Sequence, residues 1–142
     1  MANFAKLDKN NIVTTIDVVH NRELLDENLE EQESIGIQYL KNFYDEPNGV
    51  WVQCSYNGNF RGKYPCLGWT YDSVKDVFKS PKPFPSWVWS DTESEWKAPV
   101  PKPGMERPHV KWDENTISWV DHYLEGEDGY EEWIERKRSG GI

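Results

Sequence analysis

A pair of aromatic residues seven positions apart recurs in this sequence and constrains its fold more than any other feature. The three copies, each with a polar residue directly after the first ring, are Tyr71–Phe78, Trp89–Trp96 and Trp112–Trp119. A short polar turn between rings at this spacing places them opposite each other across a β-hairpin, where each pair adds about 0.2–1 kcal/mol. One hairpin cannot bury its own aromatic face, so the copies must pack on each other or on a partner.

Proline-rich segments precede the second and third copies. Residues 80–85 read Ser-Pro-Lys-Pro-Phe-Pro, and residues 98–103 read Ala-Pro-Val-Pro-Lys-Pro. Alternating prolines keep a chain extended, at about 3.1 Å per residue, so these straps are semi-rigid. We predict an α+β fold that is mostly β, in three parts: a hairpin and helix at 1–48, the Trp/Pro-rich hairpin region at 49–121, and an acidic tail at 122–142.

The N-terminal part predicts a hairpin followed by one helix. Runs rich in β-branched residues at 4–7 and 12–19 flank an Asp/Asn turn at 8–11. Asn28 is the expected N-cap, and Glu31 stands at the position of a capping-box partner. Ile37, Leu40 and Tyr44 then form the apolar stripe. Gly36 costs such a helix about 1 kcal/mol relative to Ala, so we expect a backbone to pass close to it.

A second turn, Asn-Gly at 57–58, lies between β-prone residues and predicts either a hairpin or a longer, ligand-accessible loop. The candidate ligand residues of this loop are Tyr56, Asn57, Asn59, Phe60 and Arg61.

The tail predicts a short helix after the acidic stretch 125–129. Its acidic residues come early and its basic residues late, as the helix dipole favours. Trp133 and Ile134 have little apolar company there, so we expect them to dock on another surface. Large rings dominate interface energetics, and the candidate partner-binding residues are Trp87, Trp89, Trp96, Trp112, Trp119 and Trp133. Burial in the chain's own core is the alternative for Trp87, Trp89, Trp96, Trp112 and Trp119, because Trp is often largely buried.

Charge and motifs disfavour several functions. The chain has 25 acidic and 16 basic side chains, a net charge of −9, which disfavours sequence-independent nucleic-acid binding. No run approaches the roughly 20 apolar residues of a membrane span, and the N-terminus lacks the features of a signal peptide, so we expect a soluble protein made in the cytoplasm. His20, His109 and His122 are isolated, and no nucleotide-binding or nucleophile motif occurs. We therefore expect no catalysis, metal or cofactor.

The two cysteines, Cys54 and Cys66, are expected to be free thiols in a reducing cytosol, with a disulfide across the Asn-Gly turn as the alternative.

Several runs in this chain resemble a family of small proteins encoded by marine tailed bacteriophages, cyanophages among them. The runs are Val52–Arg61, Gly68–Asp72, Pro81–Val88 and Trp96–Pro101, together with Phe4–Leu7 through Val19 and Glu23–Asn28. The resemblance covers roughly residues 1–121, and the tail from His122 departs from it. It implies a non-enzymatic, virion-associated protein, and it brings no catalytic residues.

Size, acidity, stiff straps and the many rings favour a virion structural protein that acts through protein–protein interaction. We expect multiple copies on the particle, bound to phage capsid or other virion subunits, without contact to nucleic acid or membrane. The expected role is that of a capsid decoration or cement protein that binds assembled capsid subunits and is located in the virion. The alternative is a tail- or fibre-associated module that binds glycans in host recognition. A third hypothesis is an assembly factor that leaves before the particle matures.

Overall fold

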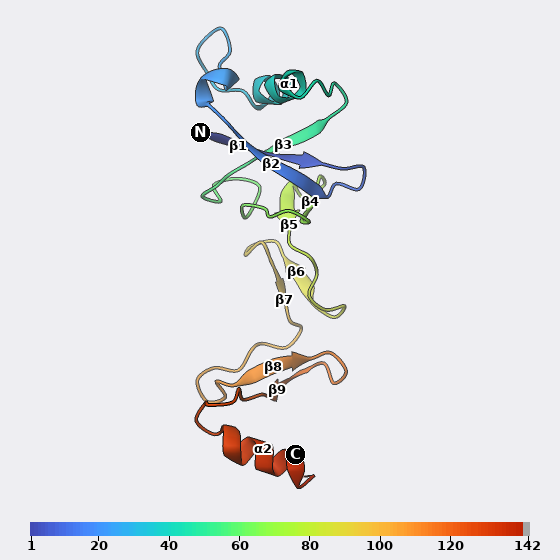
Figure 1. Ribbon diagram of the computed structural model, residues 1–142, viewed down its shortest axis with the longest axis vertical. Coiled ribbons are helices and arrows are strands. Elements are labelled where there is room, and N and C mark those ends of the chain that lie inside the picture. Colours follow the sequence, from blue (N-terminus) through green and yellow to red (C-terminus); the bar gives the residue numbers. More distant parts are fainter. Residues whose placement is uncertain (141–142) are drawn as a thin grey trace. The chain divides into compact units, whose positions relative to one another are not determined.

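The computed structural model describes residues 1–140 (Figure 1). It is 17% helical and 29% strand, which confirms an α+β fold that is mostly β. The contacts divide the chain into two compact units, residues 1–82 with 89–96 and residues 83–88 with 97–142; the three-part division stays a prediction. Within residues 1–140, no helix has both the length and the apolar character to cross a membrane.

The first unit is built on a three-stranded antiparallel sheet in the order β2-β1-β3. The predicted hairpin is confirmed: β1 (Ala2–Leu7) pairs with β2 (Val13–Val19). Its turn forms because the Asp8 carboxylate accepts hydrogen bonds from the backbone N–H groups of Asn10 and Ile12. On its other edge β1 pairs with β3 (Val50–Cys54), which therefore belongs to the N-terminal sheet.

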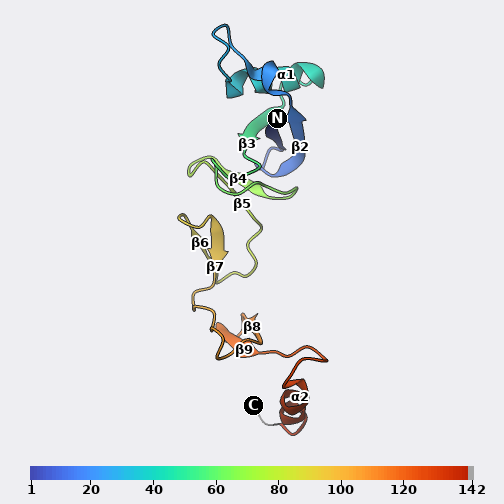
Figure 2. The same cartoon turned by 90° about the vertical axis from the view of Figure 1, so that its left-hand side faces the viewer.

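The central strand β1 is covered on both faces, because alternate residues point in opposite directions. Phe4 packs under a 3-10 helix (Asn21–Leu24) and α1 (Glu33–Phe43), in a cluster that includes Leu24, Leu40 and Trp51. Ala5 and Leu7 face the other cluster, which includes Phe78 of the first aromatic hairpin. Figure 2 shows α1 and the β4–β5 hairpin on opposite faces of this sheet.

Helix α1 begins later than the sequence predicts. Its N-cap is Gln32, without a side-chain cap, so the Asn28 capping box is wrong. The Asp26 carboxylate accepts from the N–H groups of Asn28 and Glu30 and folds residues 25–31 into a loop instead. Ile37 and Leu40 do pack on the core, whereas Tyr44 lies past the helix and is exposed.

Glycine occurs at position 36 for a different reason from the one predicted. A Cβ at this position would lie 2.5 Å from Cζ of Phe4 and 3.0 Å from Cγ of Leu24. Side chains of the core approach the helix here, where a passing backbone was expected. Glycine is therefore required by the packing of Phe4, which is fully buried.

The three aromatic hairpins form with the predicted pairing. They are β4 (Thr70–Asp72) with β5 (Val77–Lys79), β6 (Val88–Ser90) with β7 (Glu95–Lys97), and β8 (Val110–Asp113) with β9 (Ser118–Asp121). The register places Tyr71 opposite Phe78 and Trp112 opposite Trp119. The rings of Trp89 and Trp96 lie 5.3 Å apart. The i, i+7 spacing therefore predicted all three ring pairs correctly.

The hairpin turns repeat the same backbone conformation. The fifth residue after the first ring has a positive φ in each copy, at Asp76 (54°), Ser94 (51°) and Ile117 (50°). The polar residue after the first ring also bonds its own turn, as where the Asp72 carboxylate accepts from the N–H groups of Val74 and Lys75. The repeat is thus a repeat of turn geometry as well as of rings.

The tail forms the predicted short helix, α2 (Tyr130–Arg138). Trp133 is buried by its own unit, between the rings of His122, Tyr123 and Tyr130. The expectation that this ring lacks support within the chain is therefore wrong.

Candidate functional site: the aromatic faces of the repeated hairpins

Each proline-rich strap is held by the second tryptophan of the hairpin that follows it. In the first unit, the Trp96 indole N–H donates to the carbonyl of Ser80 at 2.7 Å, and the Lys82 ammonium lies 5.4 Å from the centre of the same ring. Proline segments recognise aromatic residues in this way because their backbone is extended and its carbonyls are free.

The second unit repeats this arrangement. The Trp119 indole N–H donates to the carbonyl of Val100 at 2.8 Å, and the Lys102 ammonium lies 5.8 Å from the centre of that ring. In both straps the accepting residue is followed by Pro-Lys-Pro. The structural repeat is therefore a strap plus a hairpin, and its second ring, a Trp in these two copies, supplies the indole N–H that holds the strap. Phe78 of the first copy has none.

A second lysine of the first unit contacts both rings of the β6–β7 hairpin. The Lys79 ammonium lies 5.2 Å from the Trp89 ring and 5.9 Å from the Trp96 ring, and it forms an ion pair with Asp72 at 2.9 Å. Cation–π contacts of this kind are worth about 0.5–1 kcal/mol at exposed sites.

Three indoles form a cluster in the second unit. The Trp87 ring lies 6.0 Å from that of Trp112 and 6.2 Å from that of Trp119, all edge-on. The Glu114 carboxylate ties this cluster together, since it accepts from the Trp112 indole N–H at 2.8 Å and from the Ser86 hydroxyl at 2.7 Å. Trp87 therefore joins the third hairpin's rings, whereas Trp89 joins those of the second.

This aromatic region has rings but little core. Between Phe78 and Trp112 no residue is buried, and Trp87, Trp89 and Trp96 are only half-buried. The indole nitrogens of Trp87 and Trp89 are shielded from solvent, yet they have no hydrogen-bond acceptor among the described residues. These residues belong to both units, and in each unit half-buried rings with little core are typical of a surface completed by another molecule.

The six predicted partner-binding tryptophans thus fall into three sets. Trp89 and Trp96 share one cluster, and Trp133 belongs to the tail helix. Trp87, Trp112 and Trp119 share another. Trp112 and Trp133 are buried within the chain. Half-buried rings remain at the other four positions.

The Asn-Gly segment forms a loop without a second strand, so the hairpin interpretation is wrong. Tyr56 is 72% exposed and packs edge-on against Tyr64, and Phe60 is exposed as well. Asn57 and Asn59 lie on the same exposed loop. These four side chains are available to a ligand.

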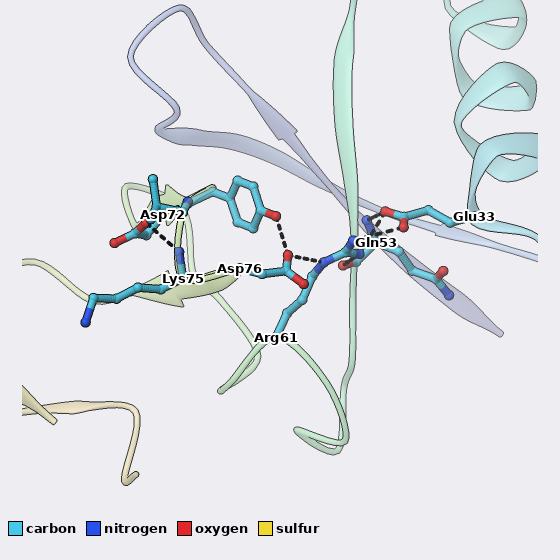
Figure 3. A network of polar contacts seen from close by, with 8 residues as sticks. Glu33, Gln53, Arg61, Asp72, Lys75 and Asp76 are labelled. Carbon is cyan, nitrogen blue, oxygen red and sulfur yellow. Dashed lines mark hydrogen bonds and ion pairs between the residues drawn. The ribbon is translucent and has the colours of Figure 1, made fainter. Parts of the chain in front are cut away.

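Arg61, the fifth residue of that loop, points inward (Figure 3). Its guanidinium donates two hydrogen bonds to the Glu33 carboxylate, at 2.8 and 3.0 Å, one to the Gln53 carbonyl at 3.0 Å, and one to Asp76 at 2.8 Å. The Tyr71 hydroxyl also donates to Asp76, which together with Arg61 lowers the pKa of that carboxyl. Arg61 therefore ties the loop to α1 and to the first hairpin.

The first unit has an exposed aromatic surface that was not predicted from the sequence. Phe43 is 66% exposed and stacks on Tyr39, with the ring centres 6.2 Å apart. Tyr44 packs edge-on against Phe43 and stacks on Trp51. The i, i+4 spacing of Tyr39 and Phe43 places both on one helix face. This spacing is the sequence feature from which the aromatic surface could have been predicted.

Each of the three histidines contacts another residue of its own chain. His20 accepts from the N–H of Arg22, His109 lies 2.9 Å from Glu127, and His122 packs on Trp133. Within residues 1–140 no group of three His, Cys, Asp or Glu side chains is arranged to hold a metal ion.

The cysteines are both free, Cys54 buried and Cys66 exposed. Burial raises the pKa of the Cys54 thiol to about 12, so it is the less reactive of the two.

Comparisons of this chain with family models, with curated proteins and with solved structures found no match.

Proposed function

We propose that this chain is a non-enzymatic structural protein of a tailed phage particle, which binds assembled capsid subunits as a decoration or cement protein. The observation that carries the proposal is the stretch between Phe78 and Trp112, where half-buried rings occur without a buried residue. Tryptophan contributes most to binding when a partner covers it. The resemblance to marine phage proteins supports a virion subunit as the partner.

The straps make the ring-bearing surface of each unit suited to binding. Indole N–H groups and lysines hold both straps against the hairpins before any partner arrives. A pre-organised surface loses less conformational entropy on association, so more of the contact energy appears as affinity.

The test uses an exposed residue within this stretch, because replacing a half-buried ring would also affect folding. Val88 is exposed on β6, and Val74 is exposed on the turn of the first hairpin. Val88→Asp should reduce the occupancy of phage particles at least about tenfold and lower their heat resistance, since a buried carboxylate opposes the contact. Val74→Asp is the matched control and should bind normally.

Two measurements on particles complete the test. Mass spectrometry of purified virions should detect the chain, and its absence would indicate an assembly factor. Labelled protein should lie over the capsid shell. Full occupancy by Val88→Asp, with unchanged heat resistance, would contradict the proposal.

The second candidate is a tail- or fibre-associated module that binds host glycans. The exposed rings of Tyr56 and Phe60 beside Asn57 and Asn59 favour it, because sugars stack on rings and bond to amides. NMR shift changes confined to this loop on adding host polysaccharide, and abolished by Tyr56→Ala, would support it. A label on the tail would also support this candidate over the first.

A further inference from the structure

A cationic groove lies in the second unit, between the third hairpin and α2. Its volume is about 620 Å³. Val120 and the small exposed part of the otherwise buried Trp133 supply its apolar lining, and three basic side chains surround them. One of these, Lys137, lies over the Trp133 ring, with its ammonium 4.7 Å from the ring centre. The full lining is Lys111, Asp113, Val120, Asp121, Trp133, Arg136, Lys137 and Gly140.

The carboxylates of this groove are already engaged. Asp121 forms an ion pair with Arg107 at 3.0 Å, and Asp113 accepts from the Thr116 hydroxyl at 2.8 Å. Among residues 1–140, neither Lys111 nor Arg136 has a carboxylate partner, although acidic residues outnumber basic ones by 25 to 16 in the whole chain. The groove therefore offers positive charge to an acidic occupant.

The first unit has an acidic loop at residues 25–31, opposite in charge to the groove. The Asp26 carboxylate accepts two backbone N–H groups and the Gln32 amide at 3.1 Å, and the strand-like ends of the loop pair at Leu25 and Glu31. Glu27 and Glu30 are exposed on it. The loop is thus a closed, hydrogen-bonded structure with an acidic surface.

Leu29 stands at the tip of this loop in a strained conformation. Its φ is 64°, a region that costs a residue other than glycine about 1–2 kcal/mol, and its side chain is 76% exposed. The chain thus holds a leucine in solvent at a position where Asn or Gly would be more stable. The turn itself is closed by the Leu29 N–H, which donates to the Asp26 carbonyl at 3.0 Å, so the leucine side chain is left in solvent and available to a partner.

We propose that the Leu29 loop of one copy docks into the Trp133 groove of a second copy. The apolar tip meets Val120 and Trp133, and Glu27 and Glu30 approach Lys111 and Arg136. Two different surfaces form this contact, so it is heterologous and produces rings or open chains of copies. It concerns self-association and does not depend on the capsid-binding function.

The test exchanges charges between loop and groove in the full-length protein. Variant A carries Glu27→Lys and Glu30→Lys, and variant B carries Lys111→Glu and Arg136→Glu. In either variant alone, the loop and the groove carry charges of the same sign and repel each other. Analytical ultracentrifugation should therefore find association at least about tenfold weaker than in wild type. Mixed one to one, A and B restore opposite charges at both kinds of contact and should associate again.

Two controls separate this contact from a general effect of charge. Leu29→Asn keeps the loop conformation and removes the apolar tip, so it should also weaken association. Lys9→Glu with Arg138→Glu makes the same charge change as variant B outside the groove, on the β1–β2 turn and on α2, and should associate as wild type does. Higher salt should weaken wild-type association.

Three results would overturn the proposal. The first is a wild-type protein that stays monomeric at all concentrations. The second is association unchanged in A and B. The third is a monomer whose groove binds single-stranded DNA in a way that variant B abolishes, because the occupant would then be a nucleic acid.

Discussion

Replacing single tryptophans by phenylalanine tests the role of the straps. Trp96→Phe and Trp119→Phe remove the indole N–H that holds a strap carbonyl. The controls are Trp89→Phe for Trp96 and Trp87→Phe for Trp119, since these rings are neighbours. Each control removes a similar ring area, but the indole N–H that it removes has no acceptor among the described residues. Each strap-holding variant therefore has a matched control in the same cluster.

The expected magnitude follows from these contacts. A hydrogen bond of this kind contributes about 0.5–1.5 kcal/mol. The weaker interaction of lysine with Phe adds to the difference for Trp119→Phe, whereas in the first pair the control Trp89→Phe also weakens a contact with Lys79. In the controls, the smaller ring lowers stability, but the substitution also removes a buried N–H donor that has no partner. Such a donor costs about 1–3 kcal/mol, so its removal offsets the lost ring area. We expect each strap-holding variant to be less stable than its control by at least about 1 kcal/mol.

Urea unfolding followed by circular dichroism measures the free energy of unfolding without relying on indole fluorescence. NMR carbonyl shifts of Ser80 and Val100, which accept the two indole N–H groups, report the straps directly. The Ser80 shift should change only in Trp96→Phe and the Val100 shift only in Trp119→Phe. Equal losses of stability in a variant and its control, with unchanged carbonyl shifts at the straps, would refute this account of the repeat.

Three further outcomes are expected. Gly36→Ala should destabilise the protein by about 1–3 kcal/mol in urea unfolding despite the better helix propensity of Ala, because the added Cβ meets the core; a gain in stability would contradict the close approach. A thiol reagent should modify Cys66 at once and Cys54 only on unfolding, since burial raises the pKa of the Cys54 thiol to about 12; equal rates would contradict this burial. Hydrogen bonding from Tyr71 lowers the pKa of Asp76 below its ordinary 3.8, so its stabilising contribution is complete above that pH and is lost as pH falls through the lowered value. Asp76→Asn should therefore flatten the acid limb of a stability–pH curve, and an unchanged limb would count against this linkage.

Local patterns in the sequence predicted much of the fold because the forces behind them act over a few residues. The i, i+7 rings specified three hairpins, since a short turn leaves only one register in which both rings meet. The Asp/Asn turn at residues 8–11 specified the first hairpin through bonds from one carboxylate. The start of α1 was mispredicted because two short-range options competed there, and the Asp26 carboxylate captured the N–H groups that an Asn28 cap would have used.

The candidate site was less predictable, because its residues acquire their roles from distant partners. Arg61 is a residue type that often binds ligands, but here its guanidinium donates to the carboxylate of Glu33, 28 positions earlier, and therefore points inward. Trp133 has few apolar neighbours in sequence, yet His122 and Tyr123 cover it.

The amino-acid sequence by itself determined where the chain turns, which rings pair across each turn, and where the prolines keep it extended. Only the tertiary structure decided which ring holds which strap, which indoles remain half-buried, and that an acidic loop and a cationic groove exist in different units. The physical reason is range: turns and cross-strand pairs are settled by neighbouring residues, whereas burial and unpaired charge depend on everything that packs around a side chain.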